Sequence, residues 1–444
     1  MQRDLARIFE DFINQADYMN GRIAEGTEKY RKGDAKIKVT AGGKACDGAK
    51  VTYKHKKHEF KFGANCFMID EMETEEKNKA YKENFAKAFN LATVPFYWKD
   101  LEPVKGQPRY AADSPKIYRR PAPDLCIDYC RENGIEPKLH CLNYDIFGPS
   151  WYRDKKADEQ KVLLEAHMAE IAERYADIIP DIEVTNEHWW ELHHASDFYT
   201  KEDYVEWSYK TADKYFPKNN LIINDGPDIT WWAPYRGCIQ RQAYYMLIER
   251  ALAKGCRIDK IGMQYHIWDY KKDMYENTRT IFNPERLYAQ MDAYSKLAPE
   301  LQVTEITLPA KGNAPEDEEY QAEILEKLYR IWFSHPNMQA VIYWNLVDGY
   351  AHRAEPGDMT AGENVHYGGL INFDSTPKKA YYKLLDLVHN EWNTSGEAVC
   401  ADDGTFGFRG FYGDYELEIV YGDKKYTKTI STSKYRDNNI TVEL

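Results

Sequence analysis

An alternation of apolar β segments with amphipathic helical segments runs through residues 58–390 and most limits what this chain can fold into. Eight segments are typical of buried strands: FKFGANCF, ATVPFYW, PKLHCLNY, DIEVTNE, LIINDG, KIGMQYHIW, LQVTEIT and AVIYWNLVD. Between them lie segments such as EQKVLLEAHMAEIAERYAD, whose apolar residues recur at the three- and four-residue spacing of one helix face. Strands that alternate with helices pair in parallel through right-handed crossovers. Eight such units in about 330 residues therefore predict an α/β fold, a closed (β/α)8 TIM barrel.

The two ends of the chain have a different pattern. Residues 1–33 predict an N-terminal helical segment, and residues 34–57 contain alternating β segments around Gly-Gly and Asp-Gly turns. Residues 393–444 again show short alternating strands, which predicts a small accessory β-sandwich module. The segment 34–57 can pack with this module, so we expect both chain ends to meet in one sandwich beside a barrel of residues 58–392. A spacer or cap is the expected role of the module, and sugar binding is the alternative.

The composition narrows the class of partner. The chain carries 59 Lys and Arg against 72 Asp and Glu, a formal net charge of −13. Nucleic-acid backbones are bound by clustered Lys and Arg, so this balance argues against a nucleic-acid partner. Aromatic residues make up 14% of the chain, with 35 Tyr and 11 Trp. Sugar rings stack their apolar faces on such side chains, but aromatic residues also fill cores, so the count favours a carbohydrate ligand only weakly.

Cysteine usage and hydropathy bear on the compartment. The eight cysteines are scattered and form no C-x-x-C pair, so we expect reduced thiols and a cytoplasmic protein. The N-terminal MQRDLARIFEDFINQ lacks the apolar run of a signal peptide, and a secreted protein whose signal was trimmed is the alternative. No stretch reaches 18 consecutive apolar residues, so we expect no membrane-spanning helix.

Polar side chains follow the predicted strands at their carboxyl ends, where the functional groups of a (β/α)8 barrel gather. Two of these groups are carboxylic acids, Glu187 after the fourth strand and Glu305 after the seventh. We therefore expect both carboxyls to face each other across the barrel mouth. Neutral and aromatic candidates for substrate binding surround them: His140, Tyr144, Asn186, Gln264, His266 and Trp344.

A pair of carboxyls of this kind suits glycoside hydrolysis. Breaking an acetal requires a protonated acid at the leaving oxygen and an anion that faces the anomeric carbon. The two carboxyls must then differ in protonation, which different surroundings can arrange. Amides such as Asn186 and Gln264 can bind sugar hydroxyls without adding charge. Each residue alone has an ordinary structural explanation, and their joint placement is what favours an enzyme.

Several short motifs resemble those of glycoside hydrolase family 10, the endo-β-1,4-xylanase family, over roughly residues 58–390. IEVTNE resembles the family's acid/base motif Trp-Asp-Val-Val-Asn-Glu, and VTEIT resembles its nucleophile motif Ile-Thr-Glu-Leu-Asp. GMQYH, HCLNY, PSW, WNLVD and GGLINFDSTPKKAYYKL resemble further motifs in the family's order. The resemblance implies a retaining hydrolase of β-glycosides on a (β/α)8 barrel, with two carboxyls about 5–5.5 Å apart.

The resemblance also implies a role for each matching residue. Glu187 would be the general acid/base and Glu305 the nucleophile. His266 would hold Glu305, and Asn186 would contact the 2-hydroxyl of the sugar under attack. His140 and Gln264 would line the −1 subsite. The cluster His188-Trp189-Trp190 would either shape the leaving-group side or pack beneath its loop.

The sequence departs from the family at positions that bind the sugar. On the second strand the family's Lys becomes Tyr97, and its Glu-Asn pair becomes Thr93-Val94. Tyr144 and His352 stand where the family has Trp. Lost donors and acceptors cost about 1 kcal/mol or more each, so we expect altered specificity. A short xylo-oligosaccharide, a decorated chain or a small β-glycoside fits better than long-chain xylan.

A further departure lies beside the nucleophile. Thr307 stands where the family has an Asp, so we expect His266 to lack one partner. Two other classes of protein remain as alternatives: a non-catalytic carbohydrate-binding barrel, and a metal-dependent barrel hydrolase. The second would need more convergent ligands than His140 and His266, and we expect no metal and no cofactor.

Overall fold

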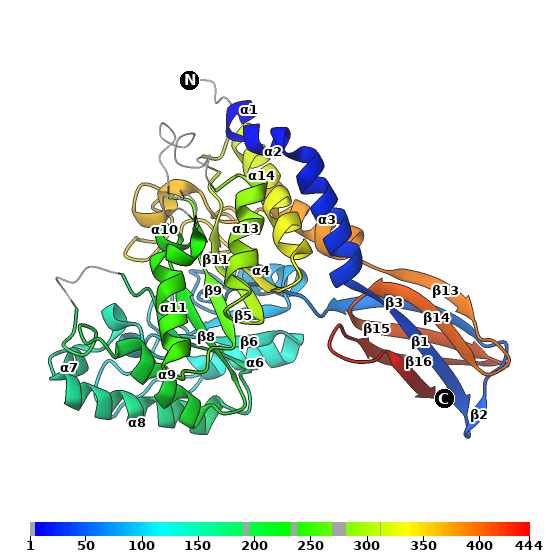
Figure 1. Cartoon of the computed structure of the whole chain (residues 1–444), viewed down its shortest axis with the longest axis horizontal. Coiled ribbons are helices and arrows are strands. Elements are labelled where there is room, and N and C mark those ends of the chain that lie inside the picture. Colours follow the sequence, from blue (N-terminus) through cyan, green and yellow to red (C-terminus); the bar gives the residue numbers. More distant parts are fainter. Residues whose placement is uncertain (1–4, 190–194, 232–237, 269–280, 311) are drawn as a thin grey trace.

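The structure is a computed structural model that describes residues 5–189, 195–231, 238–268, 281–310 and 312–444. Its larger part is a closed barrel of parallel strands, and the smaller part is a β-sandwich to one side of it (Figure 1). None of the helices in these ranges is long and apolar enough to cross a membrane.

The barrel has eight strand positions, the sixth of which is split in two. In chain order the strands are β4 (Lys61–Asn65), β5 (Leu91–Pro95), β6 (Glu136–His140), β7 (Asp181–Asn186), β8 (Asn220–Asp225), β9 (Lys260–Met263) with β10 (Tyr265–His266), β11 (Glu300–Thr307) and β12 (Met338–Tyr343). Each strand pairs in parallel with the next, and β12 pairs with β4 to close the ring. Each segment predicted as a strand overlaps one of these eight positions, which confirms the (β/α)8 barrel.

Helices cover the outside of this ring. The main ones are α4 (Glu75–Ala88), α6 (Pro123–Asn133), α8 (Ala157–Tyr175), α9 (Tyr204–Tyr215), α11 (Ala243–Ala253), α13 (Pro284–Tyr294), α14 (Pro315–Ser334) and α15 (Lys379–Asp386). Proline starts α6, α13 and α14, where its missing N–H costs nothing. All six residues of β7 are buried, as expected of a strand covered by helices on one face and by the barrel interior on the other.

The sandwich is built from both ends of the chain. One sheet has the order β14 (Thr405–Phe411), β1 (Lys32–Ala41) and β17 (Asn439–Glu443), with the short β2 (Lys44–Ala45) on β1. The other has the order β13 (Ser395–Val399), β3 (Lys50–His58), β15 (Gly413–Tyr421) and β16 (Lys424–Thr432). Their inner faces share an apolar core that includes Ile37, Leu417 and Ile419. The N-terminal β segment therefore belongs to the same module as the C-terminal strands.

Three N-terminal helices connect this sandwich to the barrel: α1 (Leu5–Ile8), α2 (Glu10–Asn14) and α3 (Ala16–Tyr30). The longest, α3, packs along α14 on the barrel's outside and leads directly into the sandwich (Figure 1). Arg31 ends it and donates to three backbone carbonyls around the start of β12, among them that of Met338 at 2.7 Å. These contacts tie the sandwich to the amino-terminal ends of the barrel strands, opposite the mouth.

Candidate active site

A cavity of about 740 Å³ opens at the carboxyl ends of the barrel strands. All of the site residues predicted from the sequence line it: Tyr97, His140, Tyr144, Asn186, Glu187, Gln264, His266, Glu305 and Trp344. A second cavity of about 480 Å³ lies between the opposite end of the barrel and the sandwich, lined by charged groups such as Lys260 and Glu300 that pair with each other. The first cavity lies at the end where barrel enzymes carry their chemistry.

Glu187 and Glu305 face the same side chain. The Nε2 of Gln264 donates to Oε1 of Glu187 and to Oε1 of Glu305, at 3.0 Å in both cases. Two oxygens that share one donor at this distance lie within about 6 Å of each other, which is compatible with the separation in a retaining glycosidase. Gln264 also donates to Asn186 at 3.2 Å, so one amide orients three polar groups of the mouth.

Glu305 lies near the carboxyl end of β11, and its carboxylate is surrounded by N–H donors. It is 4% exposed and accepts from Asn224 Nδ2 at 2.9 Å, from Gln264 Nε2 at 3.0 Å, and contacts His266 Nε2 at 3.3 Å. Asn224 is in turn oriented by the Thr304 hydroxyl, which donates to its Oδ1 at 2.5 Å. The side chain that should attack is thus held in one place by strands β8, β9, β10 and β11.

Glu187 lies just after β7 in a turn with left-handed backbone, φ = 51°. For a residue other than glycine this conformation costs on the order of 1–2 kcal/mol, so the surroundings must hold it. The backbone N–H of Glu187 donates to the carbonyl of Asn224 at 3.2 Å, and the Tyr144 hydroxyl donates to Oε2. His188 anchors the turn from below through Asp225, whose Oδ2 lies 2.7 Å from Nδ1.

Both carboxyls hold their protons more tightly than in water. Burial, with a smaller contribution from the charge of Glu305, raises the pKa of Glu187 to about 7. Burial also raises the pKa of Glu305 to about 7, although His140, Lys138 and the Asn224 hydrogen bond work against that rise. Donors and positive charge favour the anion on Glu305, while Glu187 has fewer of them. Near neutral pH the pair therefore holds one proton, and its stable place is Glu187.

His266 is a neutral orienting group. Burial lowers the pKa of its imidazole to about 4. Its Nδ1 lies 2.9 Å from the Thr307 hydroxyl and its Nε2 lies 3.3 Å from Glu305. The expectation that His266 lacks a partner is therefore wrong, because Thr307 supplies one. If the Thr307 hydroxyl donates a hydrogen bond to Nδ1, the neutral ring carries its proton on Nε2. The Nε2–H group then donates a hydrogen bond to the Glu305 carboxylate.

Comparison with known proteins places this site in a family. A sequence model of glycosyl hydrolase family 10 matches residues 53–387, most of the chain. The chain belongs to glycosyl hydrolase family 10.

The family 10 relatives differ widely in total length. Over 438 residues the chain is 24% identical to the anti-sigma-I factor RsgI6 of Acetivibrio thermocellus, covering 95% of this chain and 49% of that protein. It is 22% identical to endo-1,4-beta-xylanase 2 of Arabidopsis thaliana, covering 87% of this chain and 32% of that protein. The chain thus spans half or less of the length of these curated relatives. The structure of xylanase 10B from Thermotoga maritima superposes with a TM-score of 0.58 at 21% identity, over 75% of this chain and 97% of that one, which shows the shared fold.

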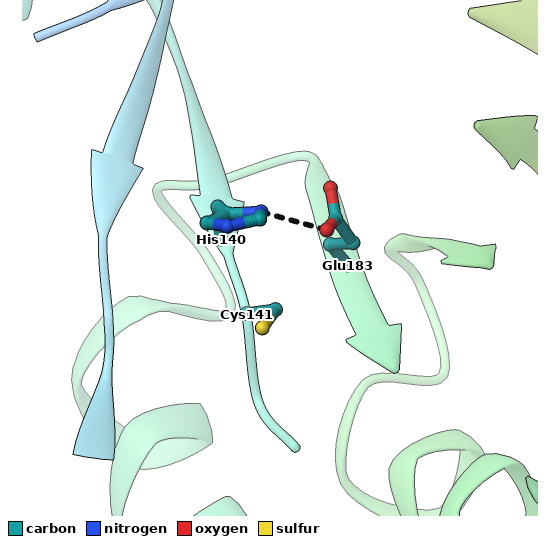
Figure 2. A group of neighbouring side chains, drawn as sticks. All are labelled: His140, Cys141 and Glu183. Carbon is teal, nitrogen blue, oxygen red and sulfur yellow. Dashed lines mark hydrogen bonds and ion pairs between the residues drawn. The ribbon is translucent and has the colours of Figure 1, made fainter. Parts of the chain in front are cut away.

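A buried ionic cluster supports the family 10 site from the third and fourth strands. Figure 2 shows the His140 imidazole facing the Glu183 carboxylate, with Nδ1 2.7 Å from Oε1. Lys138 donates to the other oxygen of Glu183, and the Tyr97 hydroxyl lies 3.0 Å from Nε2 of His140. Burial alone would raise the pKa of Glu183, but His140 and Lys138 outweigh it and lower that pKa to about 2.

The same cluster has the ligand types of a metal site. Atoms of His140, Cys141 and Glu183 lie within 4.8 Å of one another (Figure 2). Both oxygens of Glu183 and both nitrogens of His140 already have partners, and the Lys138 ammonium occupies the place that a cation would take. Burial also raises the pKa of the Cys141 thiol, which disfavours the thiolate that a metal would need. The group fits a hydrogen-bonded support for His140 better than a metal centre.

The aromatic residues after Glu187 divide between the two roles predicted for them. His188 is buried, with Nδ1 on Asp225 and Nε2 2.8 Å from the Thr185 hydroxyl, so it packs beneath the loop. Trp189 lines the cavity and is 50% exposed. Trp190 lies outside the described residues.

Several lining residues come from loops and were not predicted. Trp268 stacks on the His266 ring with centroids 4.7 Å apart, and Arg119, Arg120, Phe147, Arg353 and Glu363 line the mouth. Arg120 covers the ring of Tyr97, with its guanidinium carbon 4.0 Å from the ring centroid. In the sequence this arginine belongs to Arg-Arg-Pro at 119–121, a charged pair in a loop between two strands. A loop has no periodic pattern from which the direction of a side chain can be predicted.

Proposed function

We propose that this chain is a retaining glycoside hydrolase that cleaves β-glycosidic bonds by double displacement, and that its substrate is a short xylo-oligosaccharide or another β-glycoside rather than long-chain xylan. The observation that carries the proposal is the single Gln264 nitrogen at 3.0 Å from both carboxyls. It supports two acidic groups over one pocket, near enough to act on one sugar from opposite sides.

The first step transfers the sugar to the protein. The Glu305 carboxylate attacks the anomeric carbon while Glu187 gives its proton to the leaving oxygen. The bond between that carbon and that oxygen breaks, and an ester to Glu305 forms. The donors on Glu305 from Asn224 and Gln264 align the attacking oxygen, since a positioned reactant needs no further ordering at the moment of reaction.

The second step releases the sugar. Glu187, now an anion, takes a proton from a water molecule, and that water's oxygen attacks the anomeric carbon and displaces Glu305. Two inversions at one carbon leave the β configuration unchanged. The raised pKa of Glu187 suits this double role, because a group that titrates near the working pH can both donate and accept the proton.

Substitution of each carboxyl tests the proposal on an aryl β-xyloside with a good leaving group. We expect Glu305→Ala to lose nearly all turnover and to recover part of it with azide, yielding the α-glycosyl azide. We expect Glu187→Ala to be rescued by azide as well, yielding the β-glycosyl azide, since in that variant Glu305 still attacks. Full activity in both variants would refute the roles assigned to these carboxyls, whereas no hydrolysis by the unaltered protein would leave a carbohydrate-binding barrel as the better description.

The stereochemistry gives an independent check. Proton NMR of the first sugar released should show the β anomer before mutarotation. An initial α product would refute the role of Glu305 as nucleophile. A panel of aryl β-glycosides with xylose, glucose, arabinose and galactose would then rank the sugars, and oligosaccharides of increasing length would separate endo from exo action.

A further inference from the structure

Cationic side chains gather at one side of the active-site mouth. Arg119 and Arg120 come from the loop before α6, and Arg353 comes, next to His352, from the loop after β12. These loops leave the ring near β12, β4 and β5, whereas Glu187 follows β7 on the other side of the barrel. By the family resemblance this is the side of the non-reducing end of the sugar chain, where Tyr97 replaces the usual Lys.

Two of these arginines are buried and held in place. Arg120 is 5% exposed, and its Nε donates to Asp100 at 3.0 Å while its plane covers the Tyr97 ring. Arg119 is 3% exposed and donates from Nη2 to Asn345 at 2.8 Å. The Nε of Arg119 has no hydrogen-bond partner among the described residues. A buried guanidinium edge without an acceptor costs free energy that a bound anion can recover.

Two carboxylates hold these arginines, and a third side chain, His352, responds to their charge. Asp100 pairs with Arg120, and the side chain of Asn345 bridges Arg119 to Glu363. Burial lowers the pKa of His352 to about 4. Four nearby cations lower it in the same direction: Arg120, Arg119, Arg353 and Lys99. The charge effects on His352 all come from cations, so the field at this point of the rim is positive.

We infer that this side of the mouth binds an acidic substituent of the sugar chain, a carboxylate such as that of a uronic acid or a sulfate ester of the same charge. The planar fork of arginine matches both groups with paired hydrogen bonds. Held arginines bind without losing side-chain freedom, so the site is ready for the anion before the substrate arrives. The inference rests on the proposed function, and it names the class of substrate that the altered glycone side prefers.

A matched pair of substrates isolates the charge. One is a β-xylo-oligosaccharide that carries a glucuronic acid, and the other is the same compound with its carboxyl reduced to the alcohol. We expect kcat/KM to be at least about tenfold higher for the acid, since hydrogen bonds to charged groups are among the stronger ones. The ratio should fall as salt is raised, because the rim is partly open to solvent. A sulfated oligosaccharide beside its desulfated form distinguishes the two anions.

Variants identify the residues that supply the preference. Arg353→Gln removes an exposed charge at low risk to folding, and should lower the acid-to-alcohol ratio several-fold. Arg119→Lys keeps the charge but removes Nε, and should lower the ratio as well. Arg131→Gln is the matched control, because Arg131 lies on the outside of α6 and pairs with Asp128, so its ratio should equal that of the unaltered protein.

The proposed hydrolase activity and the proposed preference for an acidic substituent can be refuted independently of each other. Turnover of the carboxyl-reduced substrate, lost in Glu305→Ala, supports the proposed hydrolase whatever the ratio is. A ratio near or below one for both the carboxylate and the sulfate pair, in a protein that is active on the neutral substrate, overturns the inference alone. A ratio above ten that is unchanged in Arg353→Gln and in Arg119→Lys also overturns it, since the preference would then arise elsewhere.

Discussion

Replacement of Glu187 by Gln should stabilise the protein in a way that depends on pH. The pKa of Glu187 rises from 4.5 in the unfolded chain to about 7 in the folded protein, chiefly because the side chain is buried. A pKa raised by folding means that the folded state binds its proton more tightly. The contribution to stability is fully present below pH 4.5, falls as the unfolded chain ionises, and is lost by pH 7 and above.

The size of the effect follows from the same values. Each pKa unit corresponds to about 1.4 kcal/mol, so a rise from 4.5 to about 7 costs about 3 kcal/mol above pH 7. Gln is nearly isosteric with the protonated Glu and has no charge to bury. We therefore expect Glu187→Gln to gain about 2–3 kcal/mol in the free energy of unfolding at pH 8 and close to nothing at pH 4.

Urea unfolding at both pH values measures this difference. Glu132→Gln, on an exposed part of α6, is the matched control and should change stability little at either pH. A gain of the same size at pH 4 and pH 8 would refute the reasoning, because a charge-independent effect has no link to the proton. A loss at pH 8 would show that the Glu187 charge is well compensated in the fold.

Three further variants and one treatment test the surroundings of the carboxyls. Gln264→Met removes the donor shared by both anions and should move the acidic limb of the pH profile of kcat/KM up by about one unit, with no shift speaking against the bridge. Thr307→Asp should raise the pKa of His266 from about 4 and lower that of its carboxylate partner, so the acidic limb should move down, whereas Thr307→Asn should leave it in place. Lys138→Met leaves Glu183 a buried charge with one partner fewer and should cost about 3–5 kcal/mol in urea unfolding; a cost below 1 kcal/mol would mean that the pair is not needed. EDTA should leave hydrolysis unchanged, and a loss restored by a divalent cation would instead assign a metal to the His140–Glu183 group.

The predicted site residues that line the cavity share one property: they lie at or just beyond the carboxyl ends of barrel strands. Glu187 follows β7 and Glu305 lies near the carboxyl end of β11, and the β–α alternation determines which end of each strand meets the mouth. The register of a buried strand fixes where each of its side chains points. The place of a residue in a sequence motif therefore predicts its place in the barrel. The same logic brought Gln264 and His266 into the cavity.

The residues that the sequence did not predict lie on loops or act through partners distant in the chain. Arg119 and Arg120 enter the mouth from an irregular segment, and irregular backbone has no period from which to read the direction of a side chain. The charge of residue 307 alone predicts a missing partner for His266, but the hydroxyl of Thr307 can donate where the family's carboxylate would accept. The sequence leaves two roles open for His188 because its inward turn depends on Asp225, 37 residues later.

The departure at Thr307 also explains why the nucleophile holds its proton so tightly. A carboxylate at that position would favour a charged His266, and the imidazolium would stabilise the Glu305 anion at 3.3 Å. With a neutral hydroxyl there, the positive charge near Glu305 comes from His140 and Lys138, which both already contact Glu183. The Glu305 anion then rests on N–H donors from Asn224 and Gln264, and these offset its burial only in part. The pKa of Glu187 is also raised to about 7, so the two carboxyls titrate together. The active form carries one proton on the pair, and the two macroscopic pKa values that bound it belong to the pair and not to either residue.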